Sequence, residues 1–259
     1  MNYGLYLSAS GVMTNMYRQD VFANNLANVH THAFKEDLPE LRQRRPEAIE
    51  AQLGMEVSHE LLDRLGGGVF AGPQRFDMTA GPMTETGNPL DVALKEEGRF
   101  FAVSTNDPQT GAQQVHLTRD GRFMRNEAGE LVTAAGARVL DVNDDPIVLA
   151  ADATARIDPA GRVLQNGQPV AQLQVAEVND PQQLEKRGTN LFAFDGPDPR
   201  QILDNPRVHA GFIEGSGVNP ITALMRMIAA TKSVSGNADM IRHHDNLMDL
   251  AVNRLGRVA

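Results

Sequence analysis

Cysteine and tryptophan are both missing from this sequence of 259 residues, and aromatic residues make up only 5% of it. Without cysteine, disulfides, thiolate zinc sites and cysteine nucleophiles are excluded. The scarcity of aromatic side chains argues against a binding surface made of large aromatic platforms. Clustered basic residues are missing as well: the densest stretch, Arg42–Arg45, lies between two glutamates, and the formal net charge is −9. Since phosphate neutralisation needs clustered Lys and Arg, nucleic acid is not an expected partner.

Long apolar runs are also absent. No run reaches the ~18 residues that a membrane span requires, and residues 1–11 lack the basic start and continuous apolar core of a secretory signal. We therefore expect no membrane insertion and, for an exported protein, a route that cleaves no signal peptide. The composition, 41% apolar and 22% charged, is typical of a globular protein.

The motifs of common catalytic and nucleotide-binding sites are missing too. There is no Gly-x-Ser-x-Gly elbow, no His-Glu-x-x-His helix and no phosphate loop. The adjacent residues His243–Asp245 diverge by ~100° per residue on a helix, so they do not face one metal ion. The stretch Asp141–Asp145 resembles the start of a calcium loop, but Pro146 occupies the position that requires Gly. We predict no enzyme activity, no catalytic, cofactor-binding or metal site, no cofactor and no small-molecule substrate.

The two ends of the chain predict helices. Residues 2–28 contain no proline, and Gly4 and Gly11 weaken this segment by up to ~1 kcal/mol each relative to Ala. Such a helix needs a partner to stay folded. Its predicted buried stripe consists of apolar or small residues three and four positions apart: Tyr6, Ala9, Met13, Met16, Ala23 and Ala27.

The C-terminal helix has a stronger pattern. Asn219 suits an N-cap and Pro220 suits the first helical position. Apolar residues then follow a 3-4 alternation that predicts a coiled-coil-like seam, although an ordinary amphipathic helix remains an alternative. The seam positions are Leu224, Met227, Thr231, Val234, Ala238, Ile241, Asp245, Met248, Val252 and Leu255.

The middle of the chain reads as β-structure. Between residues 69 and 212, short apolar runs alternate with turn signals such as Asp120-Gly121 and Asn166-Gly167, which favour tight hairpins. The predicted fold class is mixed α and β, with N- and C-terminal helices paired as a coiled-coil-like stalk and a central antiparallel β-rich domain. The predicted domains are a helical assembly domain (1–35 and 219–259), a connector (36–68) with a short helix at 47–64, and a β-rich body (69–218).

Several stretches in this order resemble bacterial flagellar basal-body rod and hook proteins. Asn24-Asn25-Leu26-Ala27-Asn28 resembles the run that closes the first helix of that family, and Ala33 stands where the family usually carries Gly. The further stretches that carry the resemblance are Thr31–Lys35, Thr86–Leu94, Gly98–Phe101, Thr118–Phe123, Gly129–Thr133, Asn190–Phe192 and Glu214–Asn219.

The resemblance implies a rod subunit of the proximal or distal type. Its terminal helices would pack with neighbours into an inner tube that transmits torque from motor to hook, while its β domain forms the outer wall. The implied partners are copies of itself, other rod or hook proteins and the flagellar type III export apparatus, and the implied location is the periplasmic rod. A β-sandwich binding module with a coiled-coil oligomerisation stalk remains the alternative. The predicted assembly interface consists of Met13, Met16, Asn24, Asn25, Leu26, Asn28, Leu224, Met227, Val234, Ile241, Met248 and Val252.

Overall fold

The computed structural model describes residues 3–45, 66–73, 75–106, 113–150, 153–188, 190–194 and 198–255. The helix predicted at 47–64 lies outside these residues, as does most of the predicted connector. The chain forms two compact units. Unit 1 consists of Met1–Ala27, Asp37–Arg75 and Pro220–Ala259, and unit 2 of Asn28–Glu36 and Phe76–Asn219.

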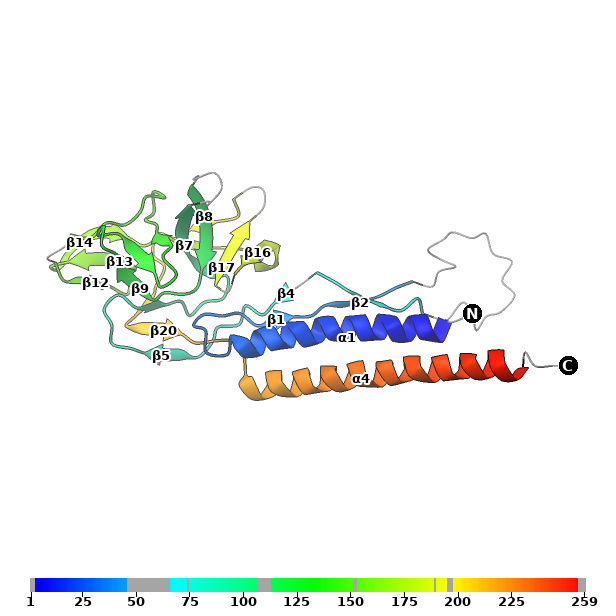
Figure 1. The fold of residues 1–259 in the computed structure, drawn as a ribbon. Helices are drawn as coiled ribbons and strands as arrows, with labels where there is room; N and C mark the ends of the chain where they lie inside the picture. The colour runs from blue at the N-terminus through cyan, green and yellow to red at the C-terminus, as the bar shows by residue number, and fades with distance from the viewer. Residues whose placement is uncertain are drawn as a thin grey trace. The chain divides into compact units, whose positions relative to one another are not determined.

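Unit 1 contains the two long helices. Helix α1 (Tyr3–Ala27) and helix α4 (Pro220–Leu250) lie side by side in opposite directions, and α4 continues into a π turn, η2 (Ala251–Leu255) (Figure 1). Gly4 lies beside His244, and Gly11 beside Asn237. Among the described residues, no helix is long and apolar enough to cross a bilayer. The strands associated with this unit are β1 (Asp37–Leu38), β2 (Leu41–Gln43), β3 (Val69–Ala71) and β4 (Arg75–Phe76), of which β2 and β3 pair antiparallel.

The prediction that the terminal helices pair as a coiled-coil-like stalk is wrong. Three of the apolar seam residues are exposed, Leu224 and Met248 by 44% and Val252 by 67%. The buried residues of α4 are instead Ala223 and Ala230. A coiled coil needs large apolar knobs along its seam, whereas α1 meets α4 through glycines that lie against polar side chains. The structure has one N-terminal and one C-terminal helix, with a mainly β region between them in the chain.

Unit 2 is built from antiparallel strands. Its largest sheet has the order β16-β17-β8-β7-β11-β10-β9, with β15 pairing with both β7 and β18. A second sheet has the order β12-β13-β14, and two further pairs are β19-β6 and β20-β5. The elements are β5 (Met83–Glu85), β6 (Val92–Ala93), β7 (Arg99–Asn106), β8 (Gln113–Thr118), β9 (Phe123–Arg125), β10 (Leu131–Thr133), β11 (Arg138–Val139), β12 (Ala155–Ile157), β13 (Arg162–Gln165), β14 (Gln168–Gln172), β15 (Val175–Glu177), the 3-10 turn η1 (Pro181–Gln183), β16 (Leu184–Arg187), β17 (Leu191–Phe194), β18 (Gln201–Ile202), β19 (His209–Ala210) and β20 (Phe212–Glu214).

Strand β7 is the centre of unit 2, because it is buried on both faces. Successive side chains of a strand point to opposite faces. Phe101 and Val103 accordingly enter one apolar cluster, while Phe100 and Ala102 enter another. This explains why the sequence shows a continuous apolar run here instead of an alternation. Unit 2 therefore has two cores of its own.

Candidate functional site

The predicted interface residues of α1 divide into exposed and buried groups. Met13 is 74% exposed and Met16 is also exposed, whereas Leu26 is half-buried. A large apolar side chain in water on a helix surface is a candidate contact for another chain. The two methionines therefore remain available for the predicted contact.

The asparagines that end α1 make contacts within the chain. The Asn25 side chain is fully buried, donates to the carbonyl of Asp37 at 2.8 Å and accepts from the Asp37 amide at 2.9 Å. Asn24 donates to the Asp37 carboxylate at 2.8 Å. In unit 2, Asn28 accepts from the hydroxyl of Thr31 at 3.0 Å. The structure thus gives these residues a role in ending the helix and fixing the chain after it, and their role between subunits stays a prediction.

The predicted interface residues of α4 differ in burial. Met227, Val234 and Ile241 are half-buried, in a row with Ala223 and Ala230 that faces α1. The remaining predicted residues, Leu224, Met248 and Val252, are exposed. The exposed side chains are therefore available for a contact with another chain, whereas the half-buried ones are already partly covered by this chain.

Glycines allow α1 to approach α4 closely. A Cβ atom on Gly4 would lie 2.6 Å from the His244 ring, and one on Gly11 would lie 2.9 Å from the Asn237 amide. Both distances are too short for a real side chain. From the sequence, these glycines were expected only to weaken the helix. Their role in packing depends on where the second helix lies, and the sequence alone gives no signal for it.

An apolar groove of about 370 Å³ lies on α1 next to β3. Met13 and the exposed ring of Phe70 belong to its lining. The Arg44 guanidinium lies over the rings of Tyr6 and Phe70, 5.9 and 5.6 Å from their centroids. Burial, followed by the nearby carboxylates of Asp37 and Glu40, raises the pKa of Tyr17, another lining residue. The full lining consists of Tyr6, Ala9, Ser10, Met13, Thr14, Tyr17, Val69, Phe70 and Ala71.

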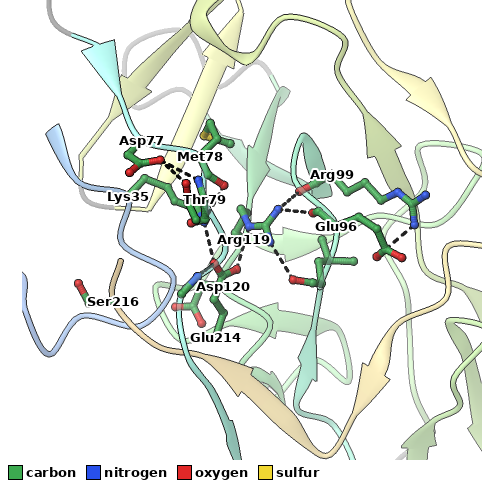
Figure 2. Close-up of polar contacts among 12 residues, drawn as sticks. Lys35, Asp77, Met78, Thr79, Glu96, Arg99, Arg119, Asp120, Glu214 and Ser216 are labelled. Carbon is green, nitrogen blue, oxygen red and sulfur yellow. Dashed lines mark hydrogen bonds and ion pairs between the residues drawn. The ribbon is translucent and has the colours of Figure 1, made fainter. Parts of the chain in front are cut away.

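Unit 2 contains a fully buried cluster of three charged side chains (Figure 2). The Glu214 carboxylate accepts from the Lys35 ammonium at 2.7 Å and from Arg119 Nε at 2.8 Å. The Arg119 guanidinium also donates hydrogen bonds to the carbonyls of Leu94, Glu96 and Arg99, all at 2.8–2.9 Å. Such complete pairing is the condition under which buried charges are tolerated.

The cluster carries more positive than negative charge. Lys35 also donates to the carbonyls of Met78 and Thr79. Burial and then repulsion from Arg119 lower the pKa of Lys35, while Glu214 opposes the decrease. The single carboxylate therefore carries most of the compensation for two buried cations.

The same region of unit 2 ties together the segments that lead towards the two helices in the chain. The Ala33 amide donates to the Glu214 carbonyl at 2.9 Å, and the Gly217 amide donates to the Phe34 carbonyl at 2.9 Å. Ala33 has a φ of 57°, in the left-handed region that favours glycine, which explains why the family pattern usually carries Gly there. Lys35, Arg119 and Glu214 each lie inside a stretch that carries the family resemblance, which was the one available signal for this cluster.

Metal ligation has no support in the part of the chain that the structure describes, where no group of three or more His, Cys, Asp or Glu residues could hold an ion. The Asp141–Asp145 stretch forms a turn in which the Asp144 amide donates to the Asp141 carbonyl. Asp144 itself pairs with Arg200 at 2.8 Å.

Comparison with known proteins gives one consistent result. Residues 209–255 match the family model described as flagellar basal body rod FlgEFG protein C-terminal. The chain is 30% identical to the flagellar basal-body rod protein FlgF of Caulobacter vibrioides, with 100% of both chains covered. It is 29% identical to FlgF of Rhizobium meliloti, covering 99% of each, and 28% identical to the rod protein FlgG of Agrobacterium fabrum, covering 97% of this chain and 98% of the relative.

Proposed function

We propose that this chain, which belongs to the flagellar basal-body rod protein family, assembles through its terminal helices into the tubular axial structure that transmits torque from motor to hook. As a member of this family it is a structural component of the flagellar basal body and not an enzyme. Rod proteins of this family assemble with other flagellar rod and hook components. Self-assembly and torque transmission are the further steps of the proposal.

The observation that carries the proposal is the apolar surface that unit 1 leaves in water. Exposed apolar side chains recur along both helices and on β2 and β3. Unit 2 has two buried apolar clusters, and its exposed large apolar residues are Met124, Val148, Val170 and Ile202. Extended apolar surface on a folded chain marks a contact with another protein. The helices thus have the surface that an assembly would bury.

The proposal assigns a role to each part of the chain. Residues 1–35 and 219–259 form the assembly domain, residues 69–218 form the outer body, and residues 36–68 connect them. The partners are further copies of the chain, other rod or hook proteins, and the flagellar type III export apparatus, which delivers the chain to the periplasm without signal cleavage. The proposed contact residues are Met13, Met16, Asn24, Asn25, Leu26, Asn28, Leu224, Met227, Val234, Ile241, Met248 and Val252.

A pair of matched variants tests the proposal. Met248→Asp places a charge on exposed α4, and Met124→Asp places the same charge at a similarly exposed position of unit 2. Because a buried Met side chain contributes about 1.5–3 kcal/mol, Met248→Asp should weaken assembly about 10- to 100-fold. Sedimentation of the purified chain and motility of complemented cells measure the effect.

The control defines the contradicting result. Met124→Asp should leave both sedimentation and motility at the wild-type level. Deletion of residues 1–27 together with 220–259 should abolish assembly while unit 2 stays soluble. Assembly that persists after both deletions would show that the terminal helices do not drive it.

A further inference from the structure

Two contacts repeat at a fixed interval between α1 and α4, which lie side by side in opposite directions (Figure 1). Gly4 lies against the ring of His244, and Gly11 lies against the amide of Asn237. Gly11 follows Gly4 by seven residues, and Asn237 precedes His244 by seven residues. Seven residues make nearly two helical turns, so the two residues of each helix lie on the same side of it. The two contacts therefore define one antiparallel register.

The same interval leads to the buried residues of α4. One further step of seven residues goes from Asn237 to Ala230, and the next goes to Ala223; these two are the buried residues of α4. On α1, the matching step goes from Gly11 to Arg18, which brings Arg18 level with Ala230. A small residue of one helix is thus level with a larger residue of the other. The small residues of this row are Gly4, Gly11, Ala223 and Ala230.

A displacement of one helix by seven residues would break this match. It is the shortest shift that keeps the same two rows in contact, and it moves the helix by about 10.5 Å. In one direction, Arg18 would come level with Asn237, and two large side chains would compete for a space in which the observed contact has a glycine. In the other direction, Gly11 would come level with Ala230, and the gap between them would lose van der Waals contact.

We infer that this row of small residues determines a single register in which α1 and α4 of one chain pair, with Gly4 and Gly11 as its closest contacts. The register decides which exposed side chains of the two helices lie at the same level. It therefore defines the surface that the helix pair presents to neighbouring chains, and assembly requires it. This consequence for assembly rests on the proposed function, whereas the register itself is a property of the single chain.

Disulfide trapping tests the register directly in a chain that has no native cysteine. Gly11→Cys with Asn237→Cys replaces one observed contact, whereas Gly11→Cys with Ala230→Cys reports a displacement by seven residues. A disulfide needs Cα atoms within about 7 Å of each other, and the displacement is about 10.5 Å. In dilute monomer under mild oxidation, the first pair should form an intrachain disulfide at least about tenfold faster than the second. The second variant keeps Asn237 against the new side chain, which favours displacement and makes the comparison stringent.

The outcomes separate this inference from the proposed function. Equal rates for the two pairs would overturn the inference, because the helices would then slide or separate. The oxidised chain with Gly11→Cys and Asn237→Cys, which is fixed in the observed register, should sediment as its reduced form does. A loss of sedimentation on oxidation alone would show that assembly uses another register, and would overturn the inference. Wild-type chains that never sediment would refute the proposed function and leave the measured register standing.

Replacing glycine by leucine gives a second measurement. Gly11→Leu puts a large side chain into the contact, whereas a Cβ atom on Gly236 of α4 would meet no described atom within 4 Å. Leu favours a helix over Gly by about the same amount at both positions. In dilute monomer, Gly236→Leu should raise the hydrogen-exchange protection of the helix amides by up to about fivefold, and Gly11→Leu should lower it by at least about fivefold. An equal increase in both variants would contradict the inference, because the glycine would then not be needed for the approach of the helices.

Discussion

Replacing Glu214 by Gln should destabilise unit 2 strongly while changing almost no volume. The Glu214 carboxylate accepts from Lys35, from Arg119 and from the Gly81 amide, at 2.7–2.8 Å. The amide of Gln offers one oxygen, adds a donor that faces other donors, and removes the only negative charge of the cluster. Two fully buried cations then remain without their counter-charge.

The magnitude follows from the burial. Removing one partner of a buried ion pair costs about 3–5 kcal/mol, against a total stability of about 5–15 kcal/mol for a natural domain. For a unit of this size we expect the melting temperature to fall by about 6–20 °C. Because the chain has no Trp, urea and thermal unfolding are best followed by far-ultraviolet circular dichroism.

Glu185→Gln is the matched control. Glu185 pairs with Arg187 at 3.1 Å on the surface, with both side chains more than half exposed. Exposed pairs contribute about 0–1 kcal/mol, so this variant should unfold almost as the wild type does. If Glu214→Gln also stayed within about 1 kcal/mol of the wild type, the cluster would not be the electrostatic anchor that the geometry indicates.

Three further predictions concern the same two units. The pKa of Lys35 is lowered from 10.5 in the folded chain, so the unfolded chain binds more protons than the folded one between the folded-state pKa and pH 10.5. In that window the stability of the wild type relative to a Lys35→Met variant should therefore rise with pH. A difference in urea midpoints that does not change with pH would contradict this. Asn25→Ala leaves the amide and carbonyl of Asp37 without their buried partner and should cost about 2–4 kcal/mol in urea unfolding, whereas an unchanged midpoint would argue against this anchor. In dilute solution, amide exchange measured by mass spectrometry should be faster in α1 and α4 than in β7, because unit 1 has few buried apolar contacts; equal protection would show that the helices need no partner.

The sequence predicted the helices and the β middle because each rests on local signals. Asn219 and Pro220 mark the start of α4, and Asn166-Gly167, with both residues at positive φ, forms the turn between β13 and β14. These features depend on the conformations that single residues prefer. They are therefore readable without knowledge of the partner elements.

The error in the helix contact has a definite origin. A 3-4 alternation of apolar residues predicts a helix face made of two rows of side chains. One predicted row, with Met227, Val234 and Ile241, does belong to the observed face of α4. The second row, however, is the one that contains Ala223 and Ala230, shifted by one residue from Leu224 and Thr231. Hydrophobicity favoured the larger side chains, whereas Gly4 and Gly11 of α1 select small and polar ones. That selection depends on the second helix and is invisible in either pattern alone.

The buried charge cluster escaped prediction for a similar reason. Lys, Arg and Glu are almost never fully buried unless they are paired, so a sequence read by hydropathy places Lys35, Arg119 and Glu214 at the surface. Their partners lie far away in the chain, and five of the contacts are to backbone carbonyls. Only a fold that brings these segments together reveals that the charges satisfy one another.

The distribution of charge along the chain is consistent with the proposed assembly through the terminal helices. Helix α1 carries only Arg18 and Asp20 among its ionisable Asp, Glu, Lys and Arg residues, although the whole chain has a net charge of −9. A large net charge keeps free chains apart, while an almost uncharged helix avoids the cost of desolvating ions when another chain covers it. The apolar groove therefore lies on a helix whose burial would desolvate few ions.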